Sequence, residues 1–515
     1  MFAGLLLMGQ LPAMAEVKLA SPFGDHMVLQ HGRPVPVWGT AAPGEQVTVV
    51  FGKQRKIVTA SLLGQWSVKL DKLMPGGPFQ LLVTGSNHLT LMDVYVGEVW
   101  LCSGQSNMDM TVAREDRNWC GVFHEKEEVA AANYPLIRVF DTDYSPALAP
   151  QASVKGHWEA VSPQTVGHVS AAAYFFARDL QQKINMPVGL ITTAFGASTA
   201  EAWIRQEALA PEPEFAPLLT AFTSKLTKYL ADTAVQNRYQ KAYAIWQPVA
   251  ARAKAAGQDE VRGPKDPNPV HDQHNPCVLW NGMVQPLVPY AIRGALWYQG
   301  ESNSPTAAIY RQLMETLIVD WRRQWGQGDF PFLYVQLANI GKTLETVPAK
   351  GGAEAIKREA QLQNLALRHT AMVVAIDNAD PDNPNNVHPK NKQEIGHRLA
   401  LAAQAVAYKQ SVSFSGPMYT KMKVEGSHIR LFFNCIDQGL SARDTQLAGF
   451  ALAGADQQFV WGQAQIEGNT VVVSSPAIAR PVAVRYGWGS NPPTSLYNKA
   501  NLPASPFRTD KWPVK

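Results

Sequence analysis

The sequence has little of what marks several common classes of protein. Only four cysteines occur among its 515 residues, and no two have the CxxC spacing of zinc sites and thioredoxin-like redox pairs. Charged residues make up 17% of the chain, the net charge is +4, and no dense run of Lys or Arg is present. Nucleic-acid binding requires a clustered basic surface, so the sequence predicts no nucleic-acid partner.

Long hydrophobic runs are also missing. The apolar run near the N-terminus, residues 2–8, is far too short to span a bilayer, so we expect no membrane span. It is followed by Ala13-Met14-Ala15, which has the small-residue pattern of a cleavage site. We therefore predict that residues 1–15 are a signal peptide and that the protein is periplasmic or secreted. In such a compartment Cys102 and Cys120 could form a disulfide or remain buried free thiols, and the sequence leaves both alternatives open.

The residues that are present are those of a well-packed globular protein, with 46% hydrophobic side chains. A chain of 515 residues exceeds one ordinary core, so we expect two or three domains. Over residues 16–92, short apolar runs such as Val35–Gly39 and Val47–Phe51 are separated by turns rich in Gly and Pro. This pattern predicts an N-terminal domain of the β-sandwich type.

From residue 93 to residue 410, strand-like segments alternate with helical ones, which predicts an α/β domain with a mostly parallel sheet. The expected helices cover 169–184, 309–325, 355–368 and 391–408, and the expected strands cover 188–192, 332–335 and 372–376. Residues 205–260 are predicted to be a helical insertion packed over the sheet. Short apolar runs return in residues 411–515, which predicts a C-terminal β region. Whether the two β regions form one domain stays open.

A serine near the start of the α/β region is the first candidate for chemistry. In the stretch Gly97–Met108, apolar strand-forming residues lead into small residues and then Ser106. A buried strand followed by a tight turn places a serine hydroxyl at the carboxyl end of a sheet, where open α/β sheets carry their active sites. Taken alone, the stretch fits an ordinary turn with a serine N-cap equally well.

Three further segments place small or polar residues where a strand or helix ends. Thr193–Trp203 contains Gly196, whose backbone N–H is open to an oxyanion. Trp297–Asn303 carries two amides and a carboxylate, and Val387–Lys390 carries His388 held between rigid neighbours. A serine needs a neighbouring base because its hydroxyl is a poor nucleophile, and donors must then stabilise the oxyanion. Together the four segments contain a serine, a candidate base and candidate oxyanion donors.

With these motifs the chain resembles the sialate O-acetylesterase family, a branch of the SGNH hydrolases. The matching segments are Phe23–Gln30, Gly97–Met108, Gly196–Trp203, Tyr290–Gly294 with Trp297–Asn303, Val387–Pro389 with Asn391, Lys392 and Gly396, and Leu502–Thr509. The resemblance covers essentially the whole chain after the predicted signal peptide. It implies an SGNH-hydrolase-like parallel sheet flanked by helices, with accessory β domains on either side.

The resemblance also implies roles for individual residues. Ser106 would be the nucleophile and His388 its base. The oxyanion hole would consist of the backbone of Ser106 and Gly196 together with an amide from Gln299 or Asn303.

One position departs from the wider pattern. Many SGNH enzymes have Asp three residues before the histidine, where this chain has Asn385. The group that orients His388 is therefore open: Glu301 is our tentative choice, and the alternatives are Asp377, Asp380, Asp382 or a backbone carbonyl alone.

The sequence thus predicts an exported serine esterase that removes O-acetyl groups from a sugar, with sialic acid as the expected substrate. An acetylxylan or other polysaccharide acetylesterase is the alternative within enzymes, and a non-catalytic carbohydrate-binding protein is the alternative of another class. No metal or organic cofactor is expected, and the run His271-Asp272-Gln273-His274 fits no common zinc spacing. The oligomeric state stays open.

Overall fold

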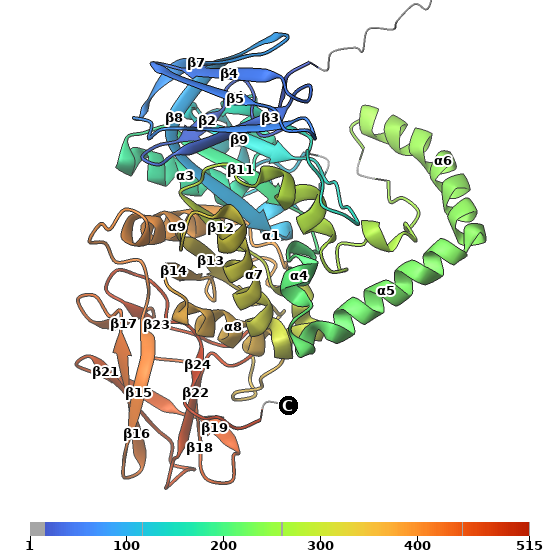
Figure 1. Ribbon diagram of the computed structural model, residues 1–515. Helices are drawn as coiled ribbons and strands as arrows, with labels where there is room; N and C mark the ends of the chain where they lie inside the picture. Colours follow the sequence, from blue (N-terminus) through green and yellow to red (C-terminus); the bar gives the residue numbers. More distant parts are fainter. Residues whose placement is uncertain (1–15, 116, 259–260, 445, 514–515) are drawn as a thin grey trace, which may run out of the picture.

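The fold has three parts stacked along one direction, with a helical arm at the side (Figure 1). The computed structural model describes residues 16–513 except 116, 259–260 and 445, so the predicted signal peptide, residues 1–15, lies outside it. A β region, an α/β region and a second β region follow each other from the N-terminus to the C-terminus. Among the described residues, no helix is long and apolar enough to cross a membrane.

A largely parallel sheet forms the centre of the molecule. Its strand order is β10-β9-β11-β8-β12-β13-β14, and every neighbouring pair is parallel except β10 with β9. The strands are β8 (His88–Gly104), β9 (Tyr134–Thr142), β10 (Gly156–Val161), β11 (Val188–Ala194), β12 (Gly294–Tyr298), β13 (Phe332–Gln336) and β14 (Thr370–Val374). The prediction of a parallel sheet in this region is confirmed.

The strand β8 connects the N-terminal β region to this sheet. Its first part pairs with β7 (Gly76–Thr84) and β2 (Val28–Gln30), and its second part lies between β11 and β12. The strand therefore continues without a break through residue 92, where we place the end of the first domain. The domain limits themselves stay a prediction.

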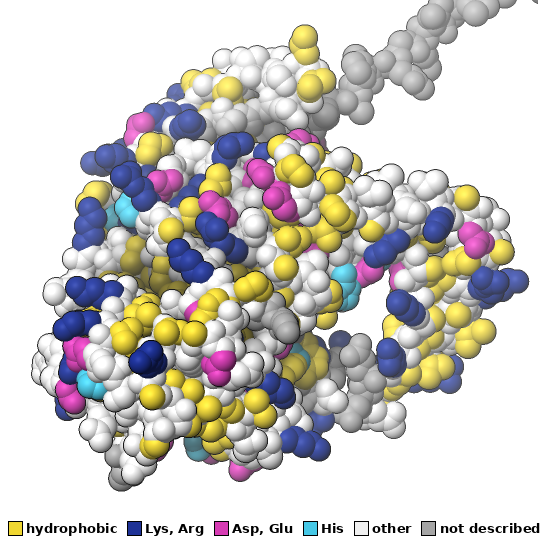
Figure 2. All heavy atoms as spheres, turned by 90° about the horizontal axis from the view of Figure 1, so that it is seen from below, with side chains coloured by type: hydrophobic (Ala, Val, Ile, Leu, Met, Phe, Trp, Pro, Cys, Tyr) yellow, Lys and Arg dark blue, Asp and Glu magenta, His cyan; other side chains and the backbone are white. Residues whose placement is uncertain are grey.

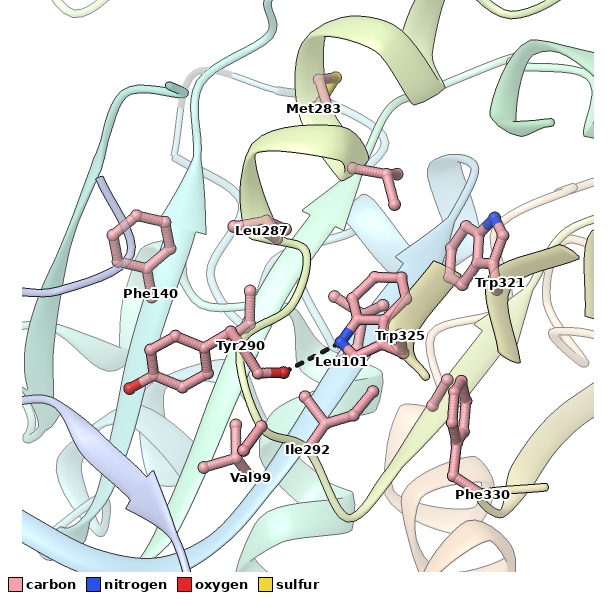
Figure 3. Close-up of a cluster of buried hydrophobic side chains, with 14 of the residues drawn as sticks. Val99, Leu101, Phe140, Met283, Leu287, Tyr290, Ile292, Trp321, Trp325 and Phe330 are labelled. Carbon is pink, nitrogen blue, oxygen red and sulfur yellow. Dashed lines mark hydrogen bonds between the residues drawn. The ribbon is translucent and has the colours of Figure 1, made fainter. Parts of the chain in front are cut away.

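The side chains of β8 alternate between two cores, because successive residues of a strand point to opposite faces. Val99 and Leu101 belong to one core, in which they pack with Trp321 and Trp325 of helix α7 (Tyr310–Trp325) (Figure 3). The indole Nε1 of Trp325 donates a hydrogen bond of 2.9 Å to the carbonyl of Tyr290. This face of the sheet is therefore covered by large aromatic side chains.

Helices α3 (Ala171–Ile184) and α9 (Lys392–Val406) cover the other face, where Trp100 and Cys102 point. The two helices approach closely at Gly396, where an added Cβ would lie 2.4 Å from the Cβ of Phe175. The helices expected around residues 169–184, 309–325 and 391–408 are confirmed. The one expected over 355–368 is α8 (Ala353–Gln363), which ends earlier in a 3₁₀ turn.

The outer β regions are built from short strands. In the N-terminal region these are β1 (Lys18–Leu19), β3 (Val35–Thr40), β4 (Gln46–Phe51), β5 (Gln54–Thr59) and β6 (Gln65–Leu70), together with β2 and β7. In the C-terminal region they are β15 (Met418–Glu425), β16 (His428–Asn434), β17 (Leu440–Ala442), β18 (Phe450–Ala453), β19 (Phe459–Trp461), β20 (Gln463–Glu467), β21 (Thr470–Ser474), β22 (Ala483–Tyr486), β23 (Leu496–Asn498) and β24 (Phe507–Arg508).

The helical insertion does not pack over the sheet, which corrects that part of the prediction. Its helices α5 (Ala216–Ala231) and α6 (Thr233–Ala255) extend from the body as an arm (Figure 1), and Ala253 is their one buried residue. Figure 2 shows apolar side chains and Lys or Arg side by side on this arm. The sequence predicts these helices correctly but not their packing. Hydrophobic periodicity indicates that a helix forms and does not identify the surface that it covers.

The four cysteines are unpaired, so Cys102 and Cys120 are free thiols and do not form a disulfide. Cys102, Cys120 and Cys277 are buried and Cys435 is exposed. Cys102 lies inside β8 and points into the core that α3 covers. Its side chain therefore acts as a small hydrophobic group.

Gly104→Ala tests the close contact that ends β8. Gly104 has φ 146°, and an added Cβ would lie 2.2 Å from the carbonyl oxygen of Tyr298. We expect the substitution to lower the free energy of unfolding by roughly 3 kcal/mol, measured by urea denaturation. Gly196→Ala is the matched control, because its nearest atoms would be 3.7 and 3.8 Å away. Equal stability of the two variants would contradict this reading.

Candidate active site

Ser106 lies where β8 ends and a short helix begins. Helix α1 (Ser106–Asp109) has Gln105 as its N-cap residue, and Ser106 is 8% exposed. No group of the described residues hydrogen-bonds to the Ser106 hydroxyl. The hydroxyl is thus free for a substrate, and its position confirms the strand-to-helix turn predicted from the sequence.

Gln105 fixes the serine turn to the segment that follows β12. Its Oε1 accepts hydrogen bonds from the backbone N–H groups of Gly300, at 3.1 Å, and Ser302, at 3.3 Å. Its own backbone N–H donates to the carbonyl of Tyr298 at 3.0 Å. Two of the motifs found in the sequence therefore meet at one edge of the sheet.

Asn107, on the other side of Ser106, joins the serine turn to the histidine loop. Its Nδ2 donates to Glu301 Oε1 and, at 2.8 Å, to the carbonyl of Val387. Because Val387 directly precedes His388, this bond brings the histidine loop against the serine turn. The side chain is 1% exposed, so these hydrogen bonds are made away from water.

Lys392 completes this buried cluster. Its Nζ donates to Asn107 Oδ1 at 2.8 Å and to the carbonyl of Pro389 at 2.6 Å, and it lies 5.6 Å from the ring centroid of Tyr298. Burial lowers the pKa of Lys392 to about 7, although the nearby Glu301 carboxylate acts in the opposite direction. A lysine, an amide and a carboxylate thus form a chain through Asn107.

His388 is held in its loop by Asn386. Asn386 Oδ1 accepts from the backbone N–H of His388 at 3.0 Å, and Asn386 Nδ2 donates to the carbonyl of His388 at 2.7 Å. The imidazole lies 4.8 Å from the ring of Trp119, measured between centroids. Burial lowers the pKa of His388 to about 4, and the charge on Lys392 contributes. His388 is therefore neutral at pH 7, as a proton acceptor must be.

None of the four candidate carboxylates bonds to His388. Glu301 is bound through Oε1 to Asn107, while its Oε2 has no hydrogen-bond partner among the described residues. Asp377 pairs with an arginine of α9 at 2.8 Å, Asp380 accepts from the side chain of Asn386 and the backbone of Lys390, and Asp382 is exposed. Burial raises the pKa of Glu301, and its contact is with the serine turn.

The two amides assigned to the oxyanion hole both have hydrogen-bond partners inside the protein, and their role in that hole stays a prediction. Gln299 Nε2 donates to the carbonyl of Ser198 at 3.1 Å and to Asn303 Oδ1 at 2.6 Å. Asn303 Nδ2 donates to Glu201 Oε2 and to Thr306 Oγ1, both at 2.9 Å. Each amide therefore uses both of its N–H hydrogens inside the protein. These bonds hold the segments together, and an amide that donates to an oxyanion would have to give up one of them.

Gly196 lies directly beside the serine, as expected of an oxyanion donor. A Cβ added to it would be 3.8 Å from the Cβ of Ser106 and 3.7 Å from Asp109 Oδ2. Its N–H interacts with the Asp109 carboxylate, which also pairs with Arg117 at 3.1 Å. Burial nevertheless raises the pKa of Asp109 above its usual range. The candidate donor Gly196 and a carboxylate thus share the space next to Ser106.

The comparisons with known proteins agree on one family. Residues 96–230 and 279–405 match the family described as "Carbohydrate esterase, sialic acid-specific acetylesterase". A carbohydrate acetylesterase from Xanthomonas citri is 35% identical, with a TM-score of 0.79 over 96% of this chain and 100% of that structure. The sialate O-acetylesterases of Mus musculus and Homo sapiens are each 28% identical, over 95% and 98% of this chain and 94% of their own length.

The chain belongs to this carbohydrate esterase family. It is therefore an enzyme, a carboxylic ester hydrolase, and the matched residues include Ser106, Gly196, Glu301 and His388. In the described part of the chain, no group of three or more His, Cys, Asp or Glu side chains is arranged to hold a metal ion.

Sequence reasoning missed four residues of the candidate site. Asn107 and Lys392 stand within matched motifs, but no pattern indicates that they bond to each other. Trp119 and Arg117 lie between motifs, where the cation of Arg117 is 5.0 Å from the indole ring. An amide next to a candidate nucleophile was the one usable sign, because buried amides require partners.

Asn107→Ala tests the connection between the serine turn and the histidine loop. The change leaves Glu301 Oε1 and the carbonyl of Val387 without a hydrogen-bond partner, and Lys392 Nζ keeps only its bond to the carbonyl of Pro389. We expect a loss of roughly 2–4 kcal/mol in the free energy of unfolding, measured by urea denaturation. We also expect a lower kcat for 4-nitrophenyl acetate with little change in KM, because the bond positions groups and does not bind substrate.

Asn118→Ala is the control, because Asn118 is exposed and its side chain has no hydrogen bond to the described residues. We expect the control to change neither stability nor kcat. An Asn107→Ala variant as stable and as active as the control would refute the proposed connection.

Proposed function

We propose that this esterase removes O-acetyl groups from sugar hydroxyls, with acetylated sialic acid as substrate, through an acetyl-serine intermediate. The hydrogen bond from Asn107 to the carbonyl of Val387 carries the proposal, because it joins the neighbour of Ser106 to the neighbour of His388. The names of the mammalian relatives support sialic acid as the sugar. The parallel sheet that ends in the serine turn supports an SGNH-type hydrolase.

In the first half of the reaction, the Ser106 hydroxyl attacks the acetyl carbonyl while His388 accepts its proton. The N–H of Ser106 donates to the oxyanion of the tetrahedral intermediate, and the N–H of Gly196 joins it by turning from the Asp109 carboxylate to the oxyanion. The C–O bond to the sugar then breaks, and the imidazolium returns its proton to the sugar oxygen. The products of this half are the free sugar hydroxyl and acetyl-Ser106.

In the second half, water takes the place of the serine hydroxyl. His388 accepts a proton from the water as its oxygen attacks the acetyl carbon, and the second tetrahedral intermediate collapses. Ser106 leaves as an alkoxide, regains its proton from His388, and acetate is released. No group outside the protein and the water is consumed.

An acetylxylan or other polysaccharide acetylesterase is the competing substrate assignment, since the same residues would cleave any acetyl ester. The Xanthomonas citri relative is described only as a carbohydrate acetylesterase, which leaves the sugar undefined. Acetate release from 9-O-acetylated sialic acid and from acetylated xylan, compared at equal ester concentration, separates the two. A higher kcat/KM for acetylated xylan would overturn sialic acid as the substrate.

We also propose that the enzyme is exported, on the basis of the apolar run and the Ala13-Met14-Ala15 pattern. Expression of the full chain followed by sequencing of the mature N-terminus checks this, and a start after residue 15 is expected. An uncleaved protein in the cytoplasm would contradict it.

Ser106→Ala tests the nucleophile. Since the hydroxyl bonds to none of the described residues, its removal should leave the melting temperature within about 2 °C of the parent. Release of acetate from the preferred acetylated sugar and from 4-nitrophenyl acetate should be lost.

A fluorophosphonate probe provides the second measurement for Ser106. It should label the parent protein and not the Ser106→Ala variant, because only an activated serine reacts. Acetate release by the Ser106→Ala variant at the parental rate would refute the proposed mechanism. An unlabelled parent would instead favour the alternative of a carbohydrate-binding protein without activity.

The pH dependence of kcat/KM tests His388 as the base. A neutral imidazole is required, and its pKa of about 4 predicts an acid limb near pH 4 instead of near the usual histidine value. Lys392→Met removes the charge that lowers this pKa but leaves the burial, so the acid limb should move upward and stay below the usual value.

Lys390→Met is the matched control, because Lys390 is exposed and lies even nearer to His388 in the sequence than Lys392 does. Its acid limb should coincide with that of the parent. An acid limb near pH 6.5 in the parent, or an identical limb in Lys392→Met, would rule out the proposed effect of the buried lysine on His388.

A further inference from the structure

A cavity of about 770 Å³ lies between the N-terminal β region and the α/β region. One side is formed by β1, β3 and β6, which make a three-stranded sheet. The other side is formed by residues 151–153, before β10, and by residues 285–289, before β12. Its volume falls within the range of about 300–1,000 Å³ that is usual for small-molecule sites.

This cavity is separate from the esterase site. Its residues 285–289 precede the amino end of β12, whereas the segment that bonds to the serine turn follows the carboxyl end of the same strand. Ser106, Gly196 and His388 are absent from its lining. A ligand bound here would leave the nucleophile accessible.

An aromatic side chain forms part of the lining. Trp38 is half-buried, and it is fixed by an edge contact with Phe23, whose ring centroid is 4.8 Å away. Trp66 lies behind it, buried, with its Nε1 bonded to the carbonyl of Thr40 at 3.0 Å. The exposed part of Trp38 is therefore a rigid apolar surface. The C–H face of a sugar ring is also apolar, and such faces pack against aromatic rings.

Neutral polar side chains surround this tryptophan. Several of them make no side-chain hydrogen bond to any described residue, namely Thr40, Gln65, Ser67, Ser153 and Gln285. Among the described residues that line the cavity, Lys18 is the one charged side chain and none is a carboxylate. Amides and hydroxyls pair with sugar hydroxyls without requiring charge on the ligand. The lining therefore suits a neutral ligand rich in hydroxyl groups.

We propose that this cavity binds a neutral oligosaccharide, as a second glycan site of the esterase. This second site goes beyond the proposed function, because glycan binding in the cavity does not depend on which acetylated sugar Ser106 cleaves. A glycan held there keeps the ester-bearing part of the same polymer near the catalytic serine, which raises its effective concentration. The site therefore acts on polymers and leaves the hydrolysis of small esters unchanged.

Affinity electrophoresis tests the site in the Ser106→Ala background, which prevents turnover. The gels contain soluble xylan, galactomannan or hydroxyethyl cellulose as neutral probes and polygalacturonate as the acidic comparison. We expect at least one neutral polysaccharide to slow the protein, and polygalacturonate to leave its mobility unchanged. Ser67→Arg fills the cavity and should lower the affinity about tenfold, and Trp38→Ala should do the same.

Lys69→Arg is the matched control, because residue 69 lies on the same strand and the same exposed side as Ser67 but is not part of the lining. It introduces the same side chain and should leave binding unchanged. Without the Ser106→Ala change, Ser67→Arg should hydrolyse 4-nitrophenyl acetate at the parental rate.

The outcomes separate this proposal from the catalytic one. No retardation by any neutral polysaccharide, stronger retardation by polygalacturonate, or equal losses in Ser67→Arg and Lys69→Arg would each overturn the glycan site. Loss of 4-nitrophenyl acetate hydrolysis in Ser67→Arg would show that the cavity is coupled to catalysis and would also overturn it. A Ser106→Ala variant that still binds the glycan supports the site even if sialic acid proves to be the wrong substrate.

Discussion

The position of the catalytic groups depends on the hydrogen bonds of a single buried amide, Asn107. Its carbonyl oxygen accepts from Lys392, and its nitrogen donates to Glu301 and to the carbonyl of Val387. A buried lysine or glutamate without partners would cost several kcal/mol. The amide removes part of that cost for both charges and fixes the serine turn against the histidine loop. Without it, the Glu301 carboxylate and a backbone carbonyl would lack partners at the centre of the site, and Lys392 would keep only its bond to the carbonyl of Pro389.

The strands and helices around this amide follow from sequence patterns that have direct physical causes. Helix α9 begins as its sequence predicts, because Asn391 accepts a hydrogen bond from the backbone N–H of Glu394 at 3.2 Å. The apolar approach to Ser106 forms a strand because both of its faces are buried. The packing of α5 and α6 could not be predicted in the same way, since helical periodicity does not identify the surface that a helix covers.

In the candidate site, too, the sequence indicates which residues are present but not where their side chains point. The sequence makes Ser106 and His388 candidates because one follows an apolar strand and the other stands between rigid neighbours, and the family resemblance implies their roles. It also identifies Gln299, Asn303 and Glu301 as polar residues of one segment. It does not reveal where their side chains point, because that depends on buried partners from distant segments, such as Ser198 and Glu201. The resemblance therefore names these amides without showing which of their N–H groups already have partners.

The arrangement favours one step of the proposed reaction over another. No carboxylate of the described residues bonds to His388, and burial and the charge of Lys392 make it a weaker base than an ordinary histidine. The same effects make its imidazolium a stronger acid. Attack by the serine hydroxyl is consequently less assisted, whereas protonation of the departing sugar oxygen is more assisted. A sugar alkoxide is a poor leaving group, so the C–O bond of an acetyl ester breaks more easily when the departing sugar oxygen is protonated. An acidic imidazolium at His388 assists that step.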